Sequence, residues 1–555
     1  MPLKNRILRF GLFPLLVYFA IFCVLTFPAI TRFGSQWYAD SSGDAIQNLW
    51  NFWHVRQSIA TLQSPYHTSM LFYPEGTTLL AQTLSPTNSF LGAGLSLVLT
   101  PYQAYNTVMI LAVVLSGLSG FLIAYYFSRS YWPSIVGGFI YGFSGFAMLH
   151  LSYGRINLMS LEWVPLFLIF WHKLLTRPSL KRGLLASLFL ILTAYTDLYY
   201  LFFACFTAAI FLAVFMFRNG WRRILDRRYL VPLALFGSLF LLAFGPFLLA
   251  LISAELKDPF IDAHPAATYS IDLLAPFLPG FLKGWYSSRL SFGEGAGEGL
   301  IGVTVLALAA YVVIKRKQFG KRFPLEWLLL LGIGFLYSLG PVLHVYHHTF
   351  GNHLIMPYTV FQDLLPFLRL AGMPDRIMAL TTLAAAVIAA VALSRIMNRK
   401  RGWLLLVLIA TAIGVEYLPA RALPAGVPPI PGYVTAIESL PDKAPVYDYY
   451  PKENPVNMLY QTLDDHPIVG GFISRRTRSV FARNNEIKQS FADGDYSALC
   501  GDGFKYLVVD ASVDLPGARL LYSGQHRKLY DLSGYSKSCT ADLTRTSLTN
   551  YSKLN

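Results

Sequence analysis

The chain has 555 residues, a length that in soluble proteins suggests three or four domains of about 150 residues each. Its composition is 54% hydrophobic and only 14% charged, with a mean hydropathy of +0.46, whereas soluble domains carry roughly 25% charged residues. This excludes an ordinary soluble protein and predicts a polytopic α-helical membrane protein. The net charge of +15 could serve nucleic acid, anionic lipid or membrane topology, and the positions of the charges decide between them.

Apolar segments long enough to cross a hydrocarbon core of ~30 Å recur along the first 420 residues. Eleven spans are predicted, near 10–30, 103–127, 131–150, 159–175, 183–199, 200–217, 229–252, 299–314, 325–343, 377–396 and 402–418. The adjoining spans of 183–217 are short, with a hinge predicted near Asp197. Segment 86–101 is predicted to be a re-entrant or interfacial helix. The first segment favours an uncleaved anchor over a signal peptide, because no A-x-A site follows it.

Basic residues are distributed very unequally between alternate loops. The loops on the side of the amino terminus hold 22 Lys and Arg residues, and the opposite membrane-proximal loops hold eight. Because cytoplasmic loops are enriched in Lys and Arg, we expect a cytoplasmic amino terminus and an extracytoplasmic carboxyl-terminal region. The positive charge is therefore a topology signal and predicts no nucleic-acid partner. Acidic residues gather in the outer loops, which suggests that the chemistry takes place on that side.

The composition changes after the last predicted span. We expect a transmembrane domain over 1–418, a Pro/Gly linker over 419–432 and an extracytoplasmic α/β domain over 433–555. The predicted elements are a helix over 433–440, strands over 445–450, 467–473 and 504–510, and a hairpin over 518–532 around Ser523-Gly524. Cys500 and Cys539 could form a disulfide in an oxidising compartment; two free thiols are the alternative.

The first outer loop, residues 31–102, contains two acidic residues that directly precede an aromatic helical segment. A carboxylate of Asp40 or Asp44 could act as a general base towards an acceptor hydroxyl, or bind a divalent cation. The alternative for Asp44 is a helix cap, which the sequence GDAIQNLW fits. The helix is predicted to anchor at the membrane interface through its apolar and aromatic side chains, namely Leu49, Trp50, Phe52 and Trp53.

Further ionisable residues are predicted on the outer side. Arg155, Arg376 and His264 suit a phosphate group through charge-assisted hydrogen bonds, although each arginine could instead snorkel or pair at the membrane edge. The remaining candidates for a substrate pocket are Glu75, Asp197 and His348. The run HVYHH lacks the ligand spacing of a zinc site. The chain contains no Walker A, GxSxG or strand-following GxGxxG motif.

Taken together, this organisation resembles the GT-C superfamily of membrane glycosyltransferases that use polyprenyl-phosphate sugars. The matching residues are Asp40 and Asp44 in ADSSGDA, the segment SPYHTSMLFYPEGTTL and the helix before PYQAYN. The carboxyl-terminal region is similar to YfhO-like and related uncharacterised GT-C proteins. That likeness is carried by AIESLPDKAPVYDYYP, by the stretch from Tyr460 to Arg475, and by FKYLVVD and KLYDL. Earlier in the chain, RLAGMPDRIMAL resembles the family's arginine-rich segment that opens a late span.

The resemblance implies inverting transfer of a sugar from a polyprenyl-phosphate donor to a glycan, lipid or protein acceptor at the outer membrane face. Asp44, or alternatively Asp40, would be the general base or the contact for Mg²⁺ or Mn²⁺. Arg376, with Arg155 as second choice, would hold the donor phosphate. The sequence lacks the adjacent Asp-Glu pair of protein mannosyltransferases and the WWD motif of oligosaccharyltransferases, which leaves the metal dependence and the acceptor open.

Two other functions are compatible with such a chain: a transporter or flippase of lipid-linked saccharides, and a non-catalytic assembly protein of GT-C shape. The sequence shows no inverted repeat, and its polar groups crowd the outer side and not the midplane that transporters use. An enzyme requires Asp44, Arg155, Asp197 and Arg376 to converge on one outer cavity with a lipid-sized lateral opening, whereas their dispersal over separate surfaces would favour an assembly protein.

Overall fold

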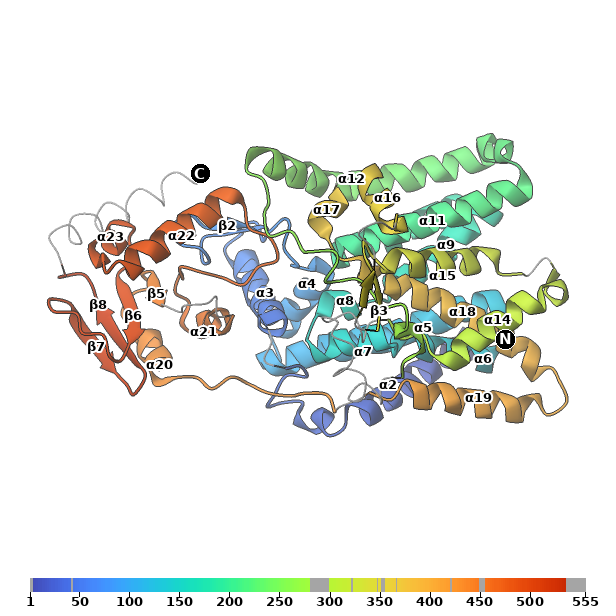
Figure 1. Ribbon diagram of the computed structural model, residues 1–555, viewed down its shortest axis with the longest axis horizontal. Helices are drawn as coiled ribbons and strands as arrows, with labels where there is room; N and C mark the ends of the chain where they lie inside the picture. The colour runs from blue at the N-terminus through green and yellow to red at the C-terminus, as the bar shows by residue number, and fades with distance from the viewer. Residues whose placement is uncertain are drawn as a thin grey trace.

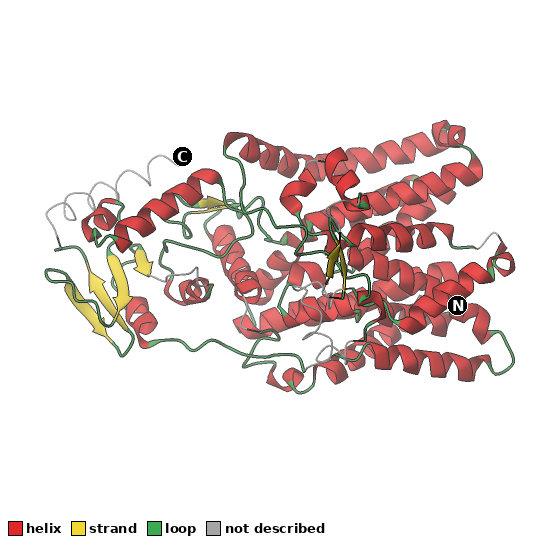
Figure 2. Cartoon of the chain, in the orientation of Figure 1, coloured by secondary structure: helices red, strands yellow, loops and turns green. Residues whose placement is uncertain are grey.

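The computed structural model describes residues 3–40, 43–279, 299–320, 323–346, 348–350, 355–365, 367–419, 422–448 and 455–535. A large helical bundle forms one end of the molecule, and a smaller region with a β-sheet forms the other (Figures 1 and 2). We call residues 422–535 the C-terminal region. Their division into separate domains at 419–432 stays a prediction.

The bundle is almost entirely helical. Its helices are α1 (Leu3–Ile7), η1 (Leu8–Leu12), α2 (Phe13–Thr26), η2 (Ala29–Arg32), α3 (Gly43–Ala60), α4 (Pro86–Leu95), α5 (Pro101–Ser128), α6 (Tyr131–Gly142), α7 (Gly145–Ser152), α8 (Ile156–Met159), α9 (Trp163–Thr176), α10 (Leu180–Thr196), α11 (Leu198–Asn219), η3 (Trp221–Leu225), α12 (Arg227–Lys257), η4 (Ala275–Phe277), α14 (Val303–Ile314), η7 (Arg316–Gln318), α15 (Leu325–Ser338), α16 (Pro357–Leu364), α17 (Phe367–Ala371), η9 (Pro374–Ile377), α18 (Met378–Met397) and α19 (Gly402–Glu416). Two short hairpins accompany them, β1 (His67–Thr68) with β2 (Thr77–Thr78) and β3 (Leu343–Val345) with β4 (His348–Phe350).

Each of the eleven predicted segments contains a helix, so the predicted class of polytopic helical membrane protein is confirmed. Among the described residues, six helices are long and apolar enough to cross a membrane, and the pair α6 and α7, bent by 42°, would make a seventh. Three shorter apolar helices, α14, α15 and α19, account for further predicted spans. The predicted hinge near Asp197 is the break between α10 and α11.

Segment 86–101 forms the ten-residue helix α4 and then turns into α5, whose Thr100 makes a capping box with Gln103. Ten helical residues extend for about 15 Å, half of the hydrocarbon core. The segment is therefore too short to cross, as predicted.

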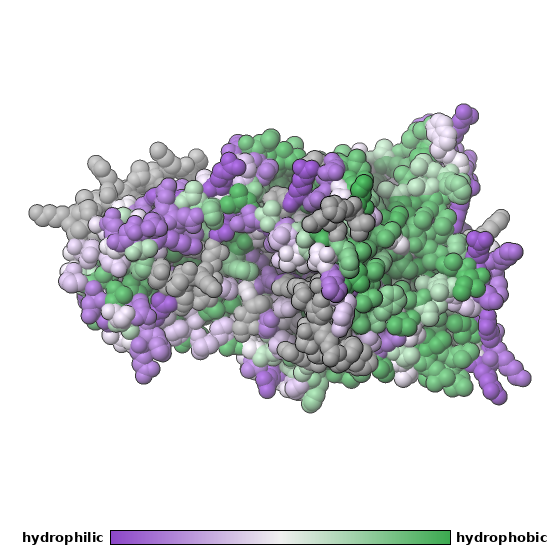
Figure 3. Space-filling view, viewed as in Figure 1, coloured by the Kyte–Doolittle hydropathy of each residue, from purple (hydrophilic) through white to green (hydrophobic). Residues whose placement is uncertain are grey.

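Helix α18 forms the centre of the bundle. Its sequence is rich in alanine, and small side chains allow neighbouring helices to approach closely. In its most apolar stretch 94% of the residues are buried, against 6% for α12, which lies at the edge of the bundle (Figure 1). Hydrophobic residues cover the bundle surface in a broad zone, with a hydrophilic fringe at the far end and mixed polarity towards the C-terminal region (Figure 3). This distribution is that of a protein embedded in a bilayer.

The C-terminal region is built around one mixed sheet in the order β5-β6-β8-β7, with β5 parallel to β6 and the other pairs antiparallel. Side chains alternate between the two faces of β6. Tyr506 and Val508 pack with α20 and α21, while Leu507 and Val509 pack with α22 and α23. The elements of the region are α20 (Gly432–Glu438), β5 (Val446–Asp448), α21 (Val456–Asp464), α22 (Arg478–Ala492), α23 (Tyr496–Gly501), β6 (Tyr506–Asp510), β7 (Arg519–Ser523) and β8 (Arg527–Asp531).

The predicted helix over 433–440, the strands over 445–450 and 504–510 and the hairpin over 518–532 are confirmed. The predicted strand over 467–473 is wrong. Only Ile468 bridges to the sheet, through Val446, and the segment instead exchanges backbone hydrogen bonds with residues 70–73 of the first outer loop. Cys500 is buried and disulfide-bonded, and Cys539 lies outside the described residues.

The aromatic helix α3 is not an interfacial anchor, so that prediction is also wrong. Trp50 is completely buried and donates its indole N–H to Oε1 of Gln461 at 2.7 Å. Trp53 donates in the same way to Asp465 at 3.2 Å. A single hydrophobic core runs from α2, α3 and α5 into α20, α21 and the sheet. The C-terminal region is therefore packed directly on the first outer loop.

Candidate functional site

The first element of the site is an ion pair between the first outer loop and the turn before α8. Nε of Arg155 donates a hydrogen bond to Oδ2 of Asp44 at 2.7 Å. Gly154 has a φ of +69°, and a Cβ there would meet the Tyr105 hydroxyl and the Ala45 side chain. Only glycine fits this close, left-handed position. The turn can therefore press against α3 and aim Arg155 at Asp44.

Asp44 is the second residue of α3 and lies in its first turn. It is therefore not the residue that caps the helix, so the alternative of a helix cap is wrong. Its side chain is 29% exposed, against 14% for Arg155. Within the part of the chain that the structure describes, Oδ1 of Asp44 accepts no hydrogen bond. The carboxylate is thus oriented through one oxygen and accessible through the other.

Asp40 lies close to Asp44. Its backbone N–H donates to the carbonyl of Ser152 at 2.9 Å. The charges of both carboxylates act on the buried hydroxyl of Tyr105. The two carboxylates that the sequence singled out therefore share one face of the bundle, beside the loop that carries Arg155.

The second element is a buried arginine on the turn that opens α18. Arg376 is only 8% exposed, and its guanidinium carbon lies 5.1 Å from the centre of the Tyr199 ring. Its charge interacts with those of Asp197 and Arg155. Asp197 itself accepts hydrogen bonds from Asn157 at 2.7 Å and from the backbone of Tyr199 at 2.8 Å. Among the described residues, no acceptor occupies the N–H groups of Arg376.

The third element brings His264 and the C-terminal region to the same place. Nη1 of Arg475 lies 2.8 Å from Nε2 of His264 and also donates to the carbonyl of Ser474. Burial, and then the positive charges of Arg475, Arg376 and Arg155, lower the pKa of His264 to about 3. The ring is therefore neutral near pH 7. Its role in binding the donor phosphate stays a prediction.

Arg475 reaches this position because the segment around it is held on both sides. On one side the N–H of Ser474 donates to Oε1 of Gln82 at 2.7 Å. On the other, Arg476 makes a bidentate ion pair with Asp262, at 2.8 and 3.1 Å. The N–H of Ile261 also donates to the carbonyl of Arg476. These contacts anchor the segment to the first outer loop and to the loop after α12.

The structure thus brings together Asp44, Asp40, Arg155, Asp197, Arg376 and His264. It does not bring Glu75 or His348 to them. Glu75 is 56% exposed and faces Arg483 of α22 at 3.8 Å, and His348 is exposed on β4 beside Phe350.

Arg475 was not predicted as a site residue. The only sequence signal was its place at the end of the stretch from Tyr460 that carries the family resemblance. The structure accounts for much of that stretch. Gln461 is completely buried, receives the Trp50 N–H and donates to the carbonyls of Met70 and His466.

A divalent cation was one of the expectations for Asp44. Among the described residues, no group of three His, Cys, Asp or Glu side chains is placed to bind a metal ion. Asp44 is engaged by a guanidinium, which competes with a cation for the same oxygen. These residues do not form a metal site of the usual kind.

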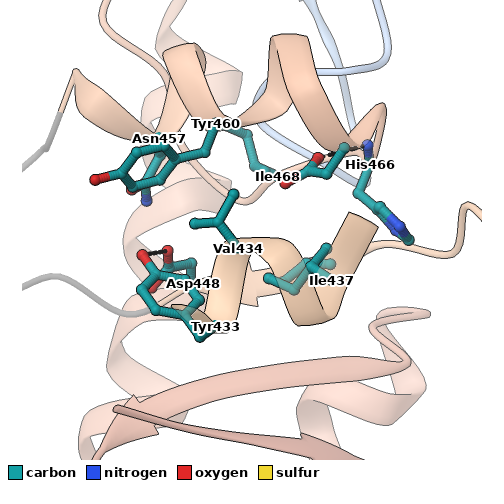
Figure 4. A pocket seen from close by; sticks show the side chains of 10 residues that line it. Tyr433, Val434, Ile437, Asp448, Asn457, Tyr460, His466 and Ile468 are labelled. Carbon is teal, nitrogen blue, oxygen red and sulfur yellow. Dashed lines mark hydrogen bonds between the residues drawn. The ribbon is translucent and has the colours of Figure 1, made fainter. Parts of the chain in front are cut away.

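A separate small cavity lies inside the C-terminal region, between α20, α21 and β5 (Figure 4). The Tyr433 hydroxyl donates to Oδ2 of Asp448 at 2.9 Å across it. Burial raises the pKa of Asp448 to about 7, and that of Asp464, which also lines the cavity, to about 7. The sequence predicted no such cavity, and its lining includes none of Arg155, Arg376 and Arg475.

The fold is similar to that of a solved membrane-protein structure. Arabinofuranosyltransferase AftD from Mycobacteria aligns with a TM-score of 0.55 and 16% identity over 93% of this chain. The match covers 41% of AftD, so the chain spans less than half the length of that protein. The archaeal oligosaccharyltransferase AglB from Archaeoglobus fulgidus gives a TM-score of 0.45 and 13% identity, covering 90% of this chain and 69% of that one. ArnT from Cupriavidus metallidurans gives 0.46 and 13%, covering 94% and 98%.

No protein of curated function matches the chain. A family model described as a domain of unknown function, DUF6311, matches residues 14–415. That match covers well over half of the sequence and includes every helix from α3 to α18. The chain has the GT-C fold that the resemblance predicted, and it belongs to the DUF6311 family.

Proposed function

We propose that the protein is an inverting membrane glycosyltransferase that takes a sugar from a polyprenyl-phosphate donor. The observation that carries this proposal is the meeting of an accessible carboxylate, Asp44, with the guanidinium groups of Arg155 and Arg376 at one place. A transferase of this kind needs a base for the acceptor hydroxyl and cations for the leaving phosphate. The Asp44 carboxylate and the two guanidinium groups support these roles.

In the proposed reaction, Oδ1 of Asp44 removes the proton from the acceptor hydroxyl while Arg155 holds Oδ2. The acceptor oxygen bonds to the anomeric carbon as the bond from that carbon to the phosphate oxygen breaks. The phosphate leaves on its polyprenyl chain, and Arg376 and Arg155 stabilise the charge that develops on it. One displacement inverts the anomeric configuration.

The site belongs, in this proposal, to the outer face of a bacterial inner membrane. The basic residues of the alternate loops support a cytoplasmic amino terminus. The C-terminal region then lies outside the cell membrane, packed against α3 beside the donor site. An acceptor glycan, lipid or protein would reach Asp44 from that side.

The proposal is tested with the purified full chain in detergent, incubated with a panel of polyprenyl-phosphate sugars, with and without Mg²⁺ or Mn²⁺. Release of polyprenyl phosphate together with transfer of the sugar to an added acceptor is the expected result. Binding of the donors with no turnover of any of them, by protein that is folded, would favour a non-catalytic assembly role.

A further inference from the structure

The contact with Arg475 defines the tautomer of His264. Nη1 of Arg475 lies 2.8 Å from Nε2 of His264. A guanidinium offers only N–H donors and does not lose its proton in proteins. Nε2 must therefore accept this hydrogen bond through its lone pair. The single proton of the neutral ring then resides on Nδ1.

The ring is surrounded by charged and titratable groups from several elements. They are Arg475 of the C-terminal region, Arg376 of η9, Arg155 ahead of α8, and Asp262 and Tyr269 of the loop after α12. Three guanidinium groups disfavour an imidazolium ion, while Asp262 acts in the opposite direction. Gly372 packs so closely that a Cβ there would meet the His264 carbonyl, which keeps the backbone in place.

The other ring nitrogen of His264, Nδ1, remains available to donate a hydrogen bond to a ligand. Within the described residues, Nδ1 of His264 makes no hydrogen bond, and the side chain is only partly buried. An N–H group beside Arg376 and Arg155 suits an oxyanion, and it adds a directed hydrogen bond without adding another charge to the cluster.

We propose that Arg475 is a positioning residue that holds His264 as the neutral Nδ1–H tautomer, and that this N–H donates to the phosphate of the lipid donor. This rests on the function proposed above. It deepens that function by assigning the C-terminal region a part in the donor site, because the segment that carries Arg475 is docked through the Arg476–Asp262 ion pair. If that region undocked from the bundle, Arg475 would no longer hold His264 in this tautomer.

The first test needs no ligand. The full chain is labelled with [¹⁵N]histidine in detergent micelles, and the His264 signal is identified by its loss in His264→Asn. The expected spectrum shows a protonated Nδ1 and a bare Nε2, unchanged between about pH 5 and pH 8. A ring that titrates in this range, or that carries its proton on Nε2, would overturn the proposal.

Variants of Arg475 extend this test. Arg475→Lys keeps a cationic donor and should preserve the tautomer. Arg475→Met removes both the donor and the charge, so the ring should move its proton to Nε2 or begin to titrate. An unchanged tautomer with no titration in the Met variant would show that Arg475 does not control His264. If the Met variant does not fold, the wild-type spectrum still decides whether His264 carries its proton on Nδ1, and the Lys variant still reports on Arg475.

The second test measures affinity for a polyprenyl methyl phosphodiester, which keeps one negative charge over this pH range. In His264→Asn the amide nitrogen can replace Nδ1, and the affinity should stay within about threefold of the wild type. In His264→Gln the amide extends to the Nε2 position, and the affinity should fall about tenfold or more. Equal affinities of the two variants would overturn the role of Nδ1–H. A wild-type chain that does not bind the diester would instead refute the proposed function, while the spectrum would still report on Arg475 and His264.

Discussion

Asp44 and Arg155 are 111 residues apart in the chain, and their side chains meet at 2.7 Å. The pair joins the first turn of α3 to the turn before α8, where Gly154 allows the close approach. One carboxylate oxygen is committed to the arginine and the other is accessible, an arrangement that suits an oriented base better than a buried structural ion pair.

Arg376→Gln should weaken donor use, because the variant loses the buried cation that has no acceptor on its N–H groups within the described residues. We expect KM for the donor to rise at least about tenfold, the effect of losing a charge-assisted hydrogen bond. Arg376→Lys keeps the charge but not the planar guanidinium fork. Its KM for the donor should therefore lie between those of the wild type and of Arg376→Gln. Steady-state kinetics with the donor varied measures this.

The matched control is Arg369→Gln. Arg369 is 66% exposed and pairs with Asp363 on the surface, so its loss should leave KM unchanged. Equal effects of the two substitutions would remove Arg376 from the donor site.

Trp50→Phe should loosen the C-terminal region from the bundle. The substitution keeps most of the buried ring but leaves Oε1 of Gln461 without its donor. An unsatisfied buried acceptor costs about 1–3 kcal/mol. We expect a lower melting temperature in micelles and faster proteolysis near residues 422–431. Trp403→Phe, at a tryptophan that is 54% exposed, should change neither property.

Stability should depend on pH through the cavity of the C-terminal region. Burial raises the pKa of Asp448 to about 7, above the ordinary value of 3.8. Between about pH 4 and pH 7 the unfolded chain gives up this proton while the folded chain keeps it, so stability falls as the pH rises. One such group contributes about 1.4 kcal/mol per pH unit within that window.

Asp448→Asn removes the contribution of Asp448 to this pH dependence of stability. Asp464, whose pKa is also raised, still contributes. The difference in unfolding free energy between pH 5 and pH 7 should shrink by about 2 kcal/mol, as measured by thermal or urea unfolding in micelles. Asp493→Asn, at an exposed carboxylate, should leave the wild-type difference intact. A wild-type stability that does not fall between pH 5 and pH 7 would contradict the burial argument.

The sequence predicted the bundle well because a bilayer imposes a length and a polarity on each span, and both can be counted. The break at Asp197 and the short helix α4 followed from the same count. The prediction for helix α3 is wrong because tryptophans such as Trp50 and Trp53 occur both at membrane interfaces and at protein contacts, and the local sequence is the same in either case. Only the distant partners Gln461 and Asp465 distinguish the two.

The site was predicted in part for a related reason. Asp44, Arg155, Arg376 and His264 are charged or titratable residues in outer loops, where they can be recognised one by one. Arg475 lies 211 residues from His264, and only the docking of the C-terminal region brings them together. Segment 467–473, PIVGGFI, is a short run rich in β-forming residues, and this composition predicts a strand of the sheet. Its backbone partners in residues 70–73 cannot be read from local pattern.

In the proposed reaction the Asp44 carboxylate is the base in sugar transfer. The most direct measurement compares transfer from a polyprenyl-phosphate sugar by wild type, Asp44→Asn and Asp363→Asn, each shown to be folded by its melting temperature. Asp363 is 75% exposed and lies in a surface pair. We predict that Asp44→Asn loses at least about 100-fold in turnover, as expected for a general base. Asp363→Asn should stay within about twofold of the wild type. Full turnover by a folded Asp44→Asn protein would contradict the assignment.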